Sequence, residues 1–347
     1  MSLGPGANEV RKLQSTGGST FTVSLPKPWV VAQGLNARDP LRVDWRPSGA
    51  LRITPLDTQT TIPKKAYFST KKLPENSLHD HLMGAYISGS DEIYIEYHPS
   101  EQKLVSVQVR RFLRSTRGFE IMDEEPSGTH IRCLMNAGDM PLQASLNRMY
   151  RQVTSLARDI LSVFDGETRE YITDAEEREN EVDALLYLIE RQVRILLDSH
   201  LVATQLKLTR TQALEYANLA RSLERMMDHA FTIATLVIEH PKLTKNMIEM
   251  TPLEQLPEWQ SSLKELMINI RTRDSNRIEK ARQDLKHAQQ RLLEHEKNVL
   301  ENHRSNLWMA FDLRLSESVR RLCAYARDFG EILLNMKVFS ELHHSVR

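Results

Sequence analysis

Two pairs of carboxylates are the residues of this chain best placed to do chemistry. Glu179 and Asp183 form one pair and Glu224 and Asp228 the other, each with a spacing of four residues. Within a helix this spacing stacks both carboxylates on one face, where they repel each other unless a cation lies between them. If the two helices are antiparallel neighbours, four acidic side chains converge on one spot. The spacing therefore indicates a candidate metal site.

The donor atoms limit the chemistry of such a site. Carboxylates without cysteine favour hard or borderline cations, so Mg²⁺, Mn²⁺, Fe or Zn²⁺ would suit it. Neither pair contains the Glu-x-x-His motif of oxygen-activating di-iron bundles. A metal-dependent hydrolase is disfavoured because no obvious histidine base or nucleophile accompanies the acids, and we predict that the chain is not an enzyme. The alternative to a metal site is a solvated acidic rim with nearby arginine partners: Arg178, Arg191, Arg221 and Arg225.

Helices are the elements that must position these carboxylates. From Pro141 onward the chain follows a helical pattern with very little glycine. An apolar stripe at bundle spacing runs through the first acidic pair, and Glu179 occupies a stripe position between Ala175 and Val182. A carboxylate at an inward position is costly unless it is paired or bound to a metal. The pattern predicts six helices, over residues 142–164, 168–199, 209–239, 253–271, 275–302 and 306–340.

The six predicted helices fall into two sets of three, which indicates a duplicated three-helix bundle. The two repeats are expected at residues 141–240 and 250–340. Residues 219–240 can be laid over residues 315–336 without a gap. In that alignment the acids of the second pair fall opposite Arg320 and Ala324. The carboxylate site is therefore expected in the first repeat only.

The first 140 residues follow a different pattern of short strands and turns. Residues 8–56 contain an alternating strand, a helical turn that begins near Pro28 and a final hairpin. A module of this size is marginal alone, so we expect it to dimerise or interleave with a second copy. Residues 57–140 predict a small α+β domain. Its elements are a helix at 79–88, strands near 91–98, 118–125 and 129–136, and a strand or helix at 104–116.

Composition and charge describe an ordinary globular protein with a basic head. Of the 347 residues 40% are hydrophobic and 27% are charged, and the formal net charge is zero. Residues 1–65 nevertheless carry nine lysines and arginines against four acids, which leaves this head at +5 and the remainder at −5. A basic head on an acidic body indicates that the head binds an anion.

Three further features indicate the cellular compartment of the protein. The chain has two isolated cysteines, Cys133 and Cys323, no apolar run of 18 residues and no signal-peptide pattern at its N-terminus. Isolated cysteines favour the reduced cytosol. We therefore expect a cytoplasmic protein without a membrane span.

The head resembles a known DNA-binding family. The sequence RKLQSTGGSTFTVSLPKPWVVAQGL, followed by a hairpin that ends at LRITP, is similar to the SpoVT-AbrB swapped-hairpin domain. The chain departs from that family at Arg38-Asp39-Pro40, where the family usually has Gly-Asp. The resemblance implies a homodimer with basic residues on a DNA-facing surface. The candidate DNA contacts are Arg11, Lys12, Lys27, Arg42 and Arg46.

The helical part resembles the PhoU family. The similarity extends over roughly residues 142–340 and is clearest in AEERENEVDALLYLIERQ and ARSLERMMDHAFTIA. PhoU bundles carry Glu/Asp-x-x-x-Asp motifs that bind multinuclear metal clusters, and Glu179 with Asp183 and Glu224 with Asp228 match these motifs. PhoU proteins act in phosphate homeostasis with phosphate transporters and signalling partners, so the resemblance implies regulation. Head and body together look like archaeal phosphate-uptake regulators.

These observations predict a multidomain α+β protein. Its parts are a swapped-hairpin β module at 8–56, a small α+β connector at 57–140 and a PhoU-like pair of three-helix bundles at 141–347. The leading hypothesis is a homodimeric DNA-binding transcriptional regulator of phosphate uptake or homeostasis, with a divalent or multinuclear metal (Fe, Zn, Mn or Mg) at the carboxylates. The alternative is an adaptor that does not bind DNA and docks on a phosphate transporter or another partner protein.

Overall fold

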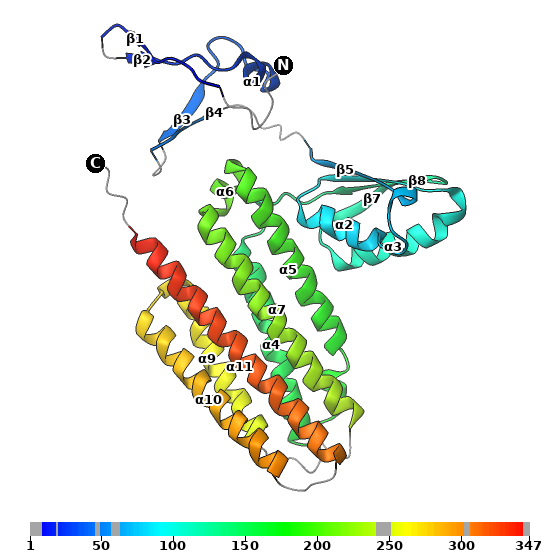
Figure 1. Cartoon of the computed structure of the whole chain (residues 1–347). Helices are drawn as coiled ribbons and strands as arrows, with labels where there is room; N and C mark the ends of the chain where they lie inside the picture. Colours follow the sequence, from blue (N-terminus) through cyan, green and yellow to red (C-terminus); the bar gives the residue numbers. More distant parts are fainter. Residues whose placement is uncertain are drawn as a thin grey trace. The chain divides into compact units, whose positions relative to one another are not determined.

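The chain divides into two compact units, with residues up to 62 in the first and residues 63–342 in the second. The computed structural model describes residues 9–18, 20–45, 49–56, 63–240, 251–301 and 306–342 (Figure 1). The second unit contains two apolar cores, one in a small α+β domain and one in a set of long helices.

The first unit consists of two short hairpins and one short helix. We use the name head for residues 1–62 of this unit from here on; because this range excludes Lys64 and Lys65, its formal charge is +3. Strands β1 (Gln14–Thr16) and β2 (Thr20–Thr22) pair antiparallel, as do β3 (Leu41–Trp45) and β4 (Leu51–Pro55). Helix α1 (Lys27–Ala32) lies between the hairpins and has a proline in its first turn. Arg38 has a φ of 83°, a left-handed conformation that favours glycine. This is the point at which the sequence departs from the Gly-Asp of the resembling family.

The described residues of the head form no apolar core. None of its described residues is buried, and none of its described strands alternates regularly between a covered and an exposed face. Large apolar side chains are instead exposed, including Phe21 at 66% and Trp45 at 75%. Two-stranded hairpins are marginally stable in water without a packed face. The described part of the head therefore carries apolar surface that its own chain does not cover.

The small α+β domain, the middle domain, is a four-stranded sheet with two helices on one face (Figure 1). Strand order is β5-β6-β8-β7, with β5 parallel to β6 and the other neighbours antiparallel. The core forms where Ile93, Ile95 and Ile131 meet the helices. The elements are β5 (Lys65–Ser69), η1 (Thr70–Lys72), α2 (Leu78–Ile87), β6 (Glu92–Glu96), η2 (Pro99–Glu101), α3 (Gln102–Ser115), β7 (Phe119–Glu125) and β8 (Gly128–Cys133).

The structure decides one open point of the sequence prediction for the middle domain and adds one strand. The ambiguous segment at 104–116 is helical, because Val105, Val109 and Phe112 bury one helical face. Strand β5 was not predicted, and it adds a parallel edge strand to the sheet. Its alternation of Ala66 and Phe68 toward the core is short, which makes the pattern weak in sequence.

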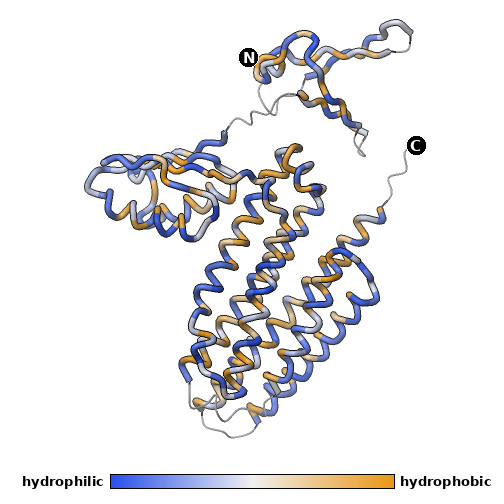
Figure 2. Tube along the Cα trace, turned by 180° about the vertical axis from the view of Figure 1, so that it is seen from behind, coloured by the Kyte–Doolittle hydropathy of each residue, from blue (hydrophilic) through white to orange (hydrophobic). Residues whose placement is uncertain are grey.

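The remaining described residues form long helices around one core. Helix α7 packs against α4, α5 and α11, and α11 packs against α9 and α10. Figure 2 shows apolar and polar residues alternating along these helices, as expected when one face of each is buried. The elements are α4 (Leu142–Phe164), η3 (Arg169–Ile172), α5 (Ala175–Asp198), α6 (His200–Leu206), α7 (Arg210–Glu239), α9 (Thr251–Thr272), α10 (Ser275–Glu301) and α11 (Asn306–Glu341).

Five of the six predicted helices agree with the structure to within two residues at each end. The prediction for 168–199 was wrong at its start, because Thr168 caps a short 3-10 turn and α5 begins only at Ala175. The short helix α6 was not predicted. Within the described residues, no helix has both the length and the apolar character that crossing a membrane requires.

The middle domain packs against α5. Arg191 of α5 is only 4% exposed, and its Nη1 donates a 2.8 Å hydrogen bond to the carbonyl oxygen of Tyr86. Its guanidinium lies 5.1 Å from the ring centroid of Tyr86 and 5.4 Å from that of Phe119. The turn after α2 comes so close that a β-carbon on Gly89, which has a φ of +86°, would lie 2.8 Å from Cγ1 of Ile195. A tightly packed contact therefore joins the middle domain to helix α5 within the second unit.

Candidate metal centre and nucleic-acid interface

The structure brings the four predicted metal-binding carboxylates to one helix–helix seam. Glu179 and Asp183 lie on α5 and Glu224 and Asp228 on α7, and these two helices pack together and run in opposite directions (Figure 1). The apolar stripes between them are buried as expected. The three acids nearer the stripes are half-buried, whereas Asp228 is exposed.

The pKa values of the α5 pair show the effect of this location. Burial raises the pKa of Glu179 to about 7, and the charges of Asp183 and Asp228 raise it further. Burial and the charge of Asp228 raise the pKa of Asp183 to about 6. Each of these carboxylates thus responds to an acid on the opposite helix, which the antiparallel packing places nearby.

The α7 pair shows the same behaviour. Burial raises the pKa of Glu224 to about 7, with further contributions from Asp228 and Asp183. Burial also raises the pKa of Asp228. Three half-buried carboxylates and the exposed Asp228 thus form a cluster in which all four pKa values are raised. We call Glu179, Asp183, Glu224 and Asp228 the carboxylate quartet.

The arginines expected as partners of an acidic rim bind elsewhere. Arg178 contacts Asp159 at 2.6 Å and Asp174 at 2.9 Å, and Arg191 contacts the middle domain. The other two are equally engaged: Arg221 pairs with Glu190, and the guanidinium of Arg225 lies 5.5 Å from the ring centroid of Tyr325. Among the residues that the structure describes, no member of the quartet forms a salt bridge. Arg221 and Arg225 lower the pKa of Glu224, but the effects that raise it are larger.

The quartet has the chemistry of a site for a hard or borderline cation. Four partly desolvated carboxylates without a contacting cation would gain from a metal ion between them. Within the described ranges, no three His, Cys, Asp or Glu side chains are gathered closely enough to hold one ion as they stand. The side chains would therefore have to turn toward a common ion, which half-exposed carboxylates can do. The four carboxylates are thus suitable metal ligands by their chemistry, but in this structure no three of them lie close enough to share one ion.

The predicted DNA-binding residues occupy different environments in the head. Lys12 and Lys27 are exposed. Arg11 pairs with Glu9, and Nε of Arg42 lies 2.8 Å from Oδ1 of Asp44 on the same strand. Arg46 lies outside the described residues. The head thus presents two exposed lysines, together with two arginines that are held by neighbouring acids.

Comparison with known proteins finds a family match for the first part of the helical region, and none for α9, α10 or α11. Residues 146–237 match the family model of the PhoU domain. The match extends from α4 through almost all of α7 and includes the whole quartet. It shows a PhoU-type domain in this part of the chain. Searches of curated proteins and of solved structures find no match.

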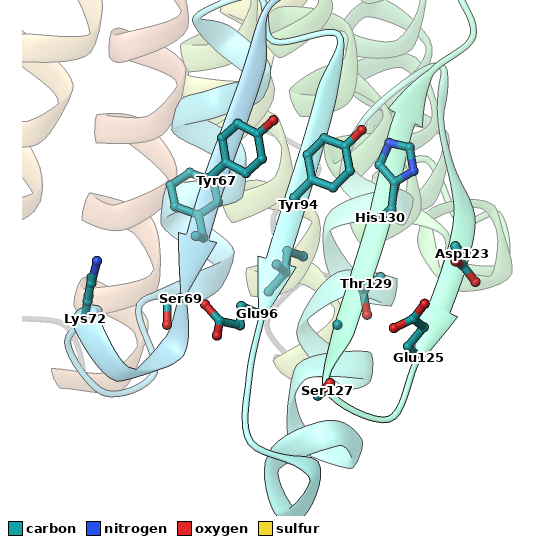
Figure 3. Close-up of a pocket in the computed structure, with 13 residues that line it drawn as sticks. Tyr67, Ser69, Lys72, Tyr94, Glu96, Asp123, Glu125, Ser127, Thr129 and His130 are labelled. Atoms are coloured by element: carbon teal, nitrogen blue, oxygen red, sulfur yellow. The ribbon is translucent and has the colours of Figure 1, made fainter.

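Sequence reasoning assigned no site to the middle domain. The structure shows a pocket there on the face of the sheet opposite the helices, lined by Tyr67, Tyr94 and His130 (Figure 3). The available signal was the alternation in KAYFS and EIYIE, which places aromatic residues at matching positions of two strands. It was not decisive because the pairing of those strands could not be predicted from the sequence.

Proposed function

We propose that this chain is a non-catalytic, homodimeric DNA-binding regulator of the PhoU type that acts in phosphate uptake or homeostasis. We further propose that the carboxylate quartet holds a metal ion or cluster. The observation that carries the proposal is a basic head, none of whose described residues is buried, on a chain with a PhoU-domain match. The match supports the regulatory role, and the head supports dimerisation and DNA binding.

Dimerisation follows from the uncovered apolar surface of the head. Val10, Phe21, Val43, Trp45 and Leu51 are between 57% and 96% exposed in a module of about 50 residues. Contiguous apolar surface on a soluble protein marks an interaction site. A second copy that interleaves its hairpins with the first would bury these side chains and supply the missing core.

DNA binding follows from the charge of the same module. Its exposed lysines can neutralise phosphates, which makes binding fall steeply as salt rises. The test is fluorescence anisotropy with a duplex from the chain's own promoter region, over a series of salt concentrations. In the Lys12→Ala/Lys27→Ala variant we expect weaker binding and a slope of log affinity against log salt that is smaller by about 0.9 for each phosphate contact removed.

A control variant separates the head from general charge effects. Lys280→Ala/Lys286→Ala removes the same charge from exposed positions of α10 and should leave affinity and slope unchanged. Absent or salt-insensitive binding by the wild-type chain would refute DNA binding.

The quartet would hold the metal through its four carboxylate groups. When bound, the ion would supply the positive charge that the quartet lacks and would link α5 to α7. Elemental analysis of the purified protein should find metal that is lost in Glu179→Ala/Asp228→Ala. The matched variant Glu177→Ala/Glu239→Ala removes exposed acids from the same two helices and should retain it. Equal metal content in all three proteins would refute the assignment of a metal site to the quartet.

A second candidate is an adaptor whose head only dimerises and whose acidic body docks on a phosphate transporter or another partner. The observation in its favour is that Arg11 and Arg42 are already paired within the head. Their guanidinium groups would have to leave Glu9 and Asp44 to contact phosphates. A dimeric chain that shows no salt-dependent binding to any duplex would favour this candidate.

A further inference from the structure

The open face of the middle-domain sheet carries a row of three stacked rings. Strand pairing sets Tyr67 beside Tyr94 and Tyr94 beside His130. The first two rings have centroids 5.0 Å apart and planes 11° apart, and the second two 4.2 Å and 4°. Figure 3 shows the three side chains projecting to the same side of β5, β6 and β8. Tyr67 at the end of the row is 70% exposed, so aromatic surface is available to a ligand.

The acid on one side of this row is neutralised within the domain. Glu92 accepts a 2.7 Å hydrogen bond from the Tyr94 hydroxyl and lies 3.0 Å from Nζ of Lys65. These two partners lower the pKa of Glu92. The Lys65 ammonium also lies 5.5 Å from the Tyr94 ring centroid. The domain thus already contains one ammonium group that lies close to both an aromatic ring and a carboxylate.

The other side of the row has acids without such a partner. There the rings border a pocket of about 500 Å³, with Glu96, Asp123 and Glu125 around it (Figure 3). Lys72 is the cation among its lining residues, which leaves two negative charges at neutral pH. In the part of the chain that the structure describes, none of the three carboxylates forms a salt bridge. Aromatic surface and unneutralised carboxylates therefore face one cavity.

We propose that this pocket binds a small organic cation that carries ammonium or guanidinium groups. Carboxylates attract the charge, and tyrosine rings favour cations that are desolvated against them. The volume lies in the range of small-molecule sites. Phosphate-bearing ligands are disfavoured by the same acids. The site goes beyond the regulatory function proposed above and gives the middle domain a ligand of its own.

Isothermal titration calorimetry on the full-length chain tests this assignment with two probes, spermidine for ammonium groups and agmatine for a guanidinium. Glu96→Gln/Glu125→Gln removes two pocket charges and should weaken binding of the preferred probe at least tenfold. Glu120→Gln/Glu124→Gln removes the same charge from β7 outside the lining residues and should change affinity less than twofold. Tyr67→Ala should also weaken binding, because it removes the exposed ring.

Several results would overturn the proposal. The first is that neither probe binds at millimolar concentration. The second is that both charge variants lose affinity equally, which would show that the probes respond to the overall charge of the domain and not to a specific site. Full competition by an equal charge concentration of MgCl₂ would lead to the same conclusion. If Tyr67→Ala changes the sedimentation coefficient of the chain without changing probe affinity, the face belongs to a contact between copies.

Discussion

At the scale of single residues, the quartet makes stability depend on pH in a defined direction. The folded pKa values of Glu179, Asp183 and Glu224 are about 7, 6 and 7, above their ordinary values of 4.5, 3.8 and 4.5. Between about pH 4 and pH 7 the folded chain therefore binds more protons than the unfolded chain, and the free energy of unfolding falls as pH rises. Stability from this source is complete below the unfolded values and is lost through pH 7.

Replacing two acids of the quartet by neutral residues should reduce the loss of stability that occurs as pH rises. We expect Glu179→Gln/Glu224→Gln, measured with a chelator present, to raise Tm by about 2 °C at pH 8 and to leave it unchanged at pH 4. The expected change in Tm is small because solvent screens half-exposed charges. Thermal unfolding followed by circular dichroism measures it. The matched variant Glu177→Gln/Glu239→Gln should show no such pH dependence, and equal behaviour of the two variants would contradict the assignment.

The sequence predicted which acids meet but not what surrounds them. Spacing of four residues and a shared seam were enough to place Glu179 near Asp228 and Asp183 near Glu224. The choice of partners by the arginines could not be predicted, because Arg178 reaches Asp159 on α4 and Arg225 reaches Tyr325 on α11. Such contacts depend on the relative rotation of neighbouring helices, which a periodic pattern leaves open.

At the scale of elements, Arg191 is the residue that fastens α5 to the middle domain. It hydrogen-bonds the carbonyl oxygen of Tyr86 and lies 3.6 Å from Oδ1 of Asp91. We expect Arg191→Ala to lower the free energy of unfolding by about 2–3 kcal/mol, because it leaves these acceptors without their donor and removes the guanidinium that packs against the rings of Tyr86 and Phe119. Arg191→Lys should recover only part of the loss, since lysine lacks the planar guanidinium fork.

Chemical denaturation with urea measures this effect. Arg194→Ala, three residues further along the same helix and exposed, is the control and should cost less than about 0.5 kcal/mol. If both variants unfold at the same urea concentration as the wild-type chain, the contact between α5 and the middle domain contributes nothing to stability.

Periodicity predicted long helices better than short elements. Helices α4, α7, α9, α10 and α11 repeat their apolar stripe over many turns, so their limits could be read from the sequence. The start of α5 could not, because a 3-10 turn and an α-helix have similar composition at Arg169–Ile172. Strand β5 has five residues and gains its pairing from β6, which lies more than 20 residues away. Such a strand is specified by its partner more than by its own pattern.

At the scale of the whole molecule, the uncovered head predicts the oligomeric state. We expect the wild-type chain to sediment as a dimer, because a second copy that interleaves its hairpins with the first would cover the exposed apolar residues of the head. Phe21→Ser/Trp45→Ser should raise the dimer dissociation constant at least tenfold and weaken DNA binding in parallel. Sedimentation velocity over a concentration series measures the first effect and anisotropy the second.

The control for this prediction lies on the middle domain. Leu104→Ser/Val107→Ser removes two apolar side chains of α3 that are 56% and 59% exposed, and it should leave the dimer intact. Circular dichroism should show unchanged helix content in both variants, since the long helices have an apolar core that contains none of the substituted residues. A wild-type chain that sediments as a monomer would contradict dimerisation through the head. A head variant that stays dimeric but loses DNA binding would place the dimer contact elsewhere on the molecule and retain the head as the DNA-binding element.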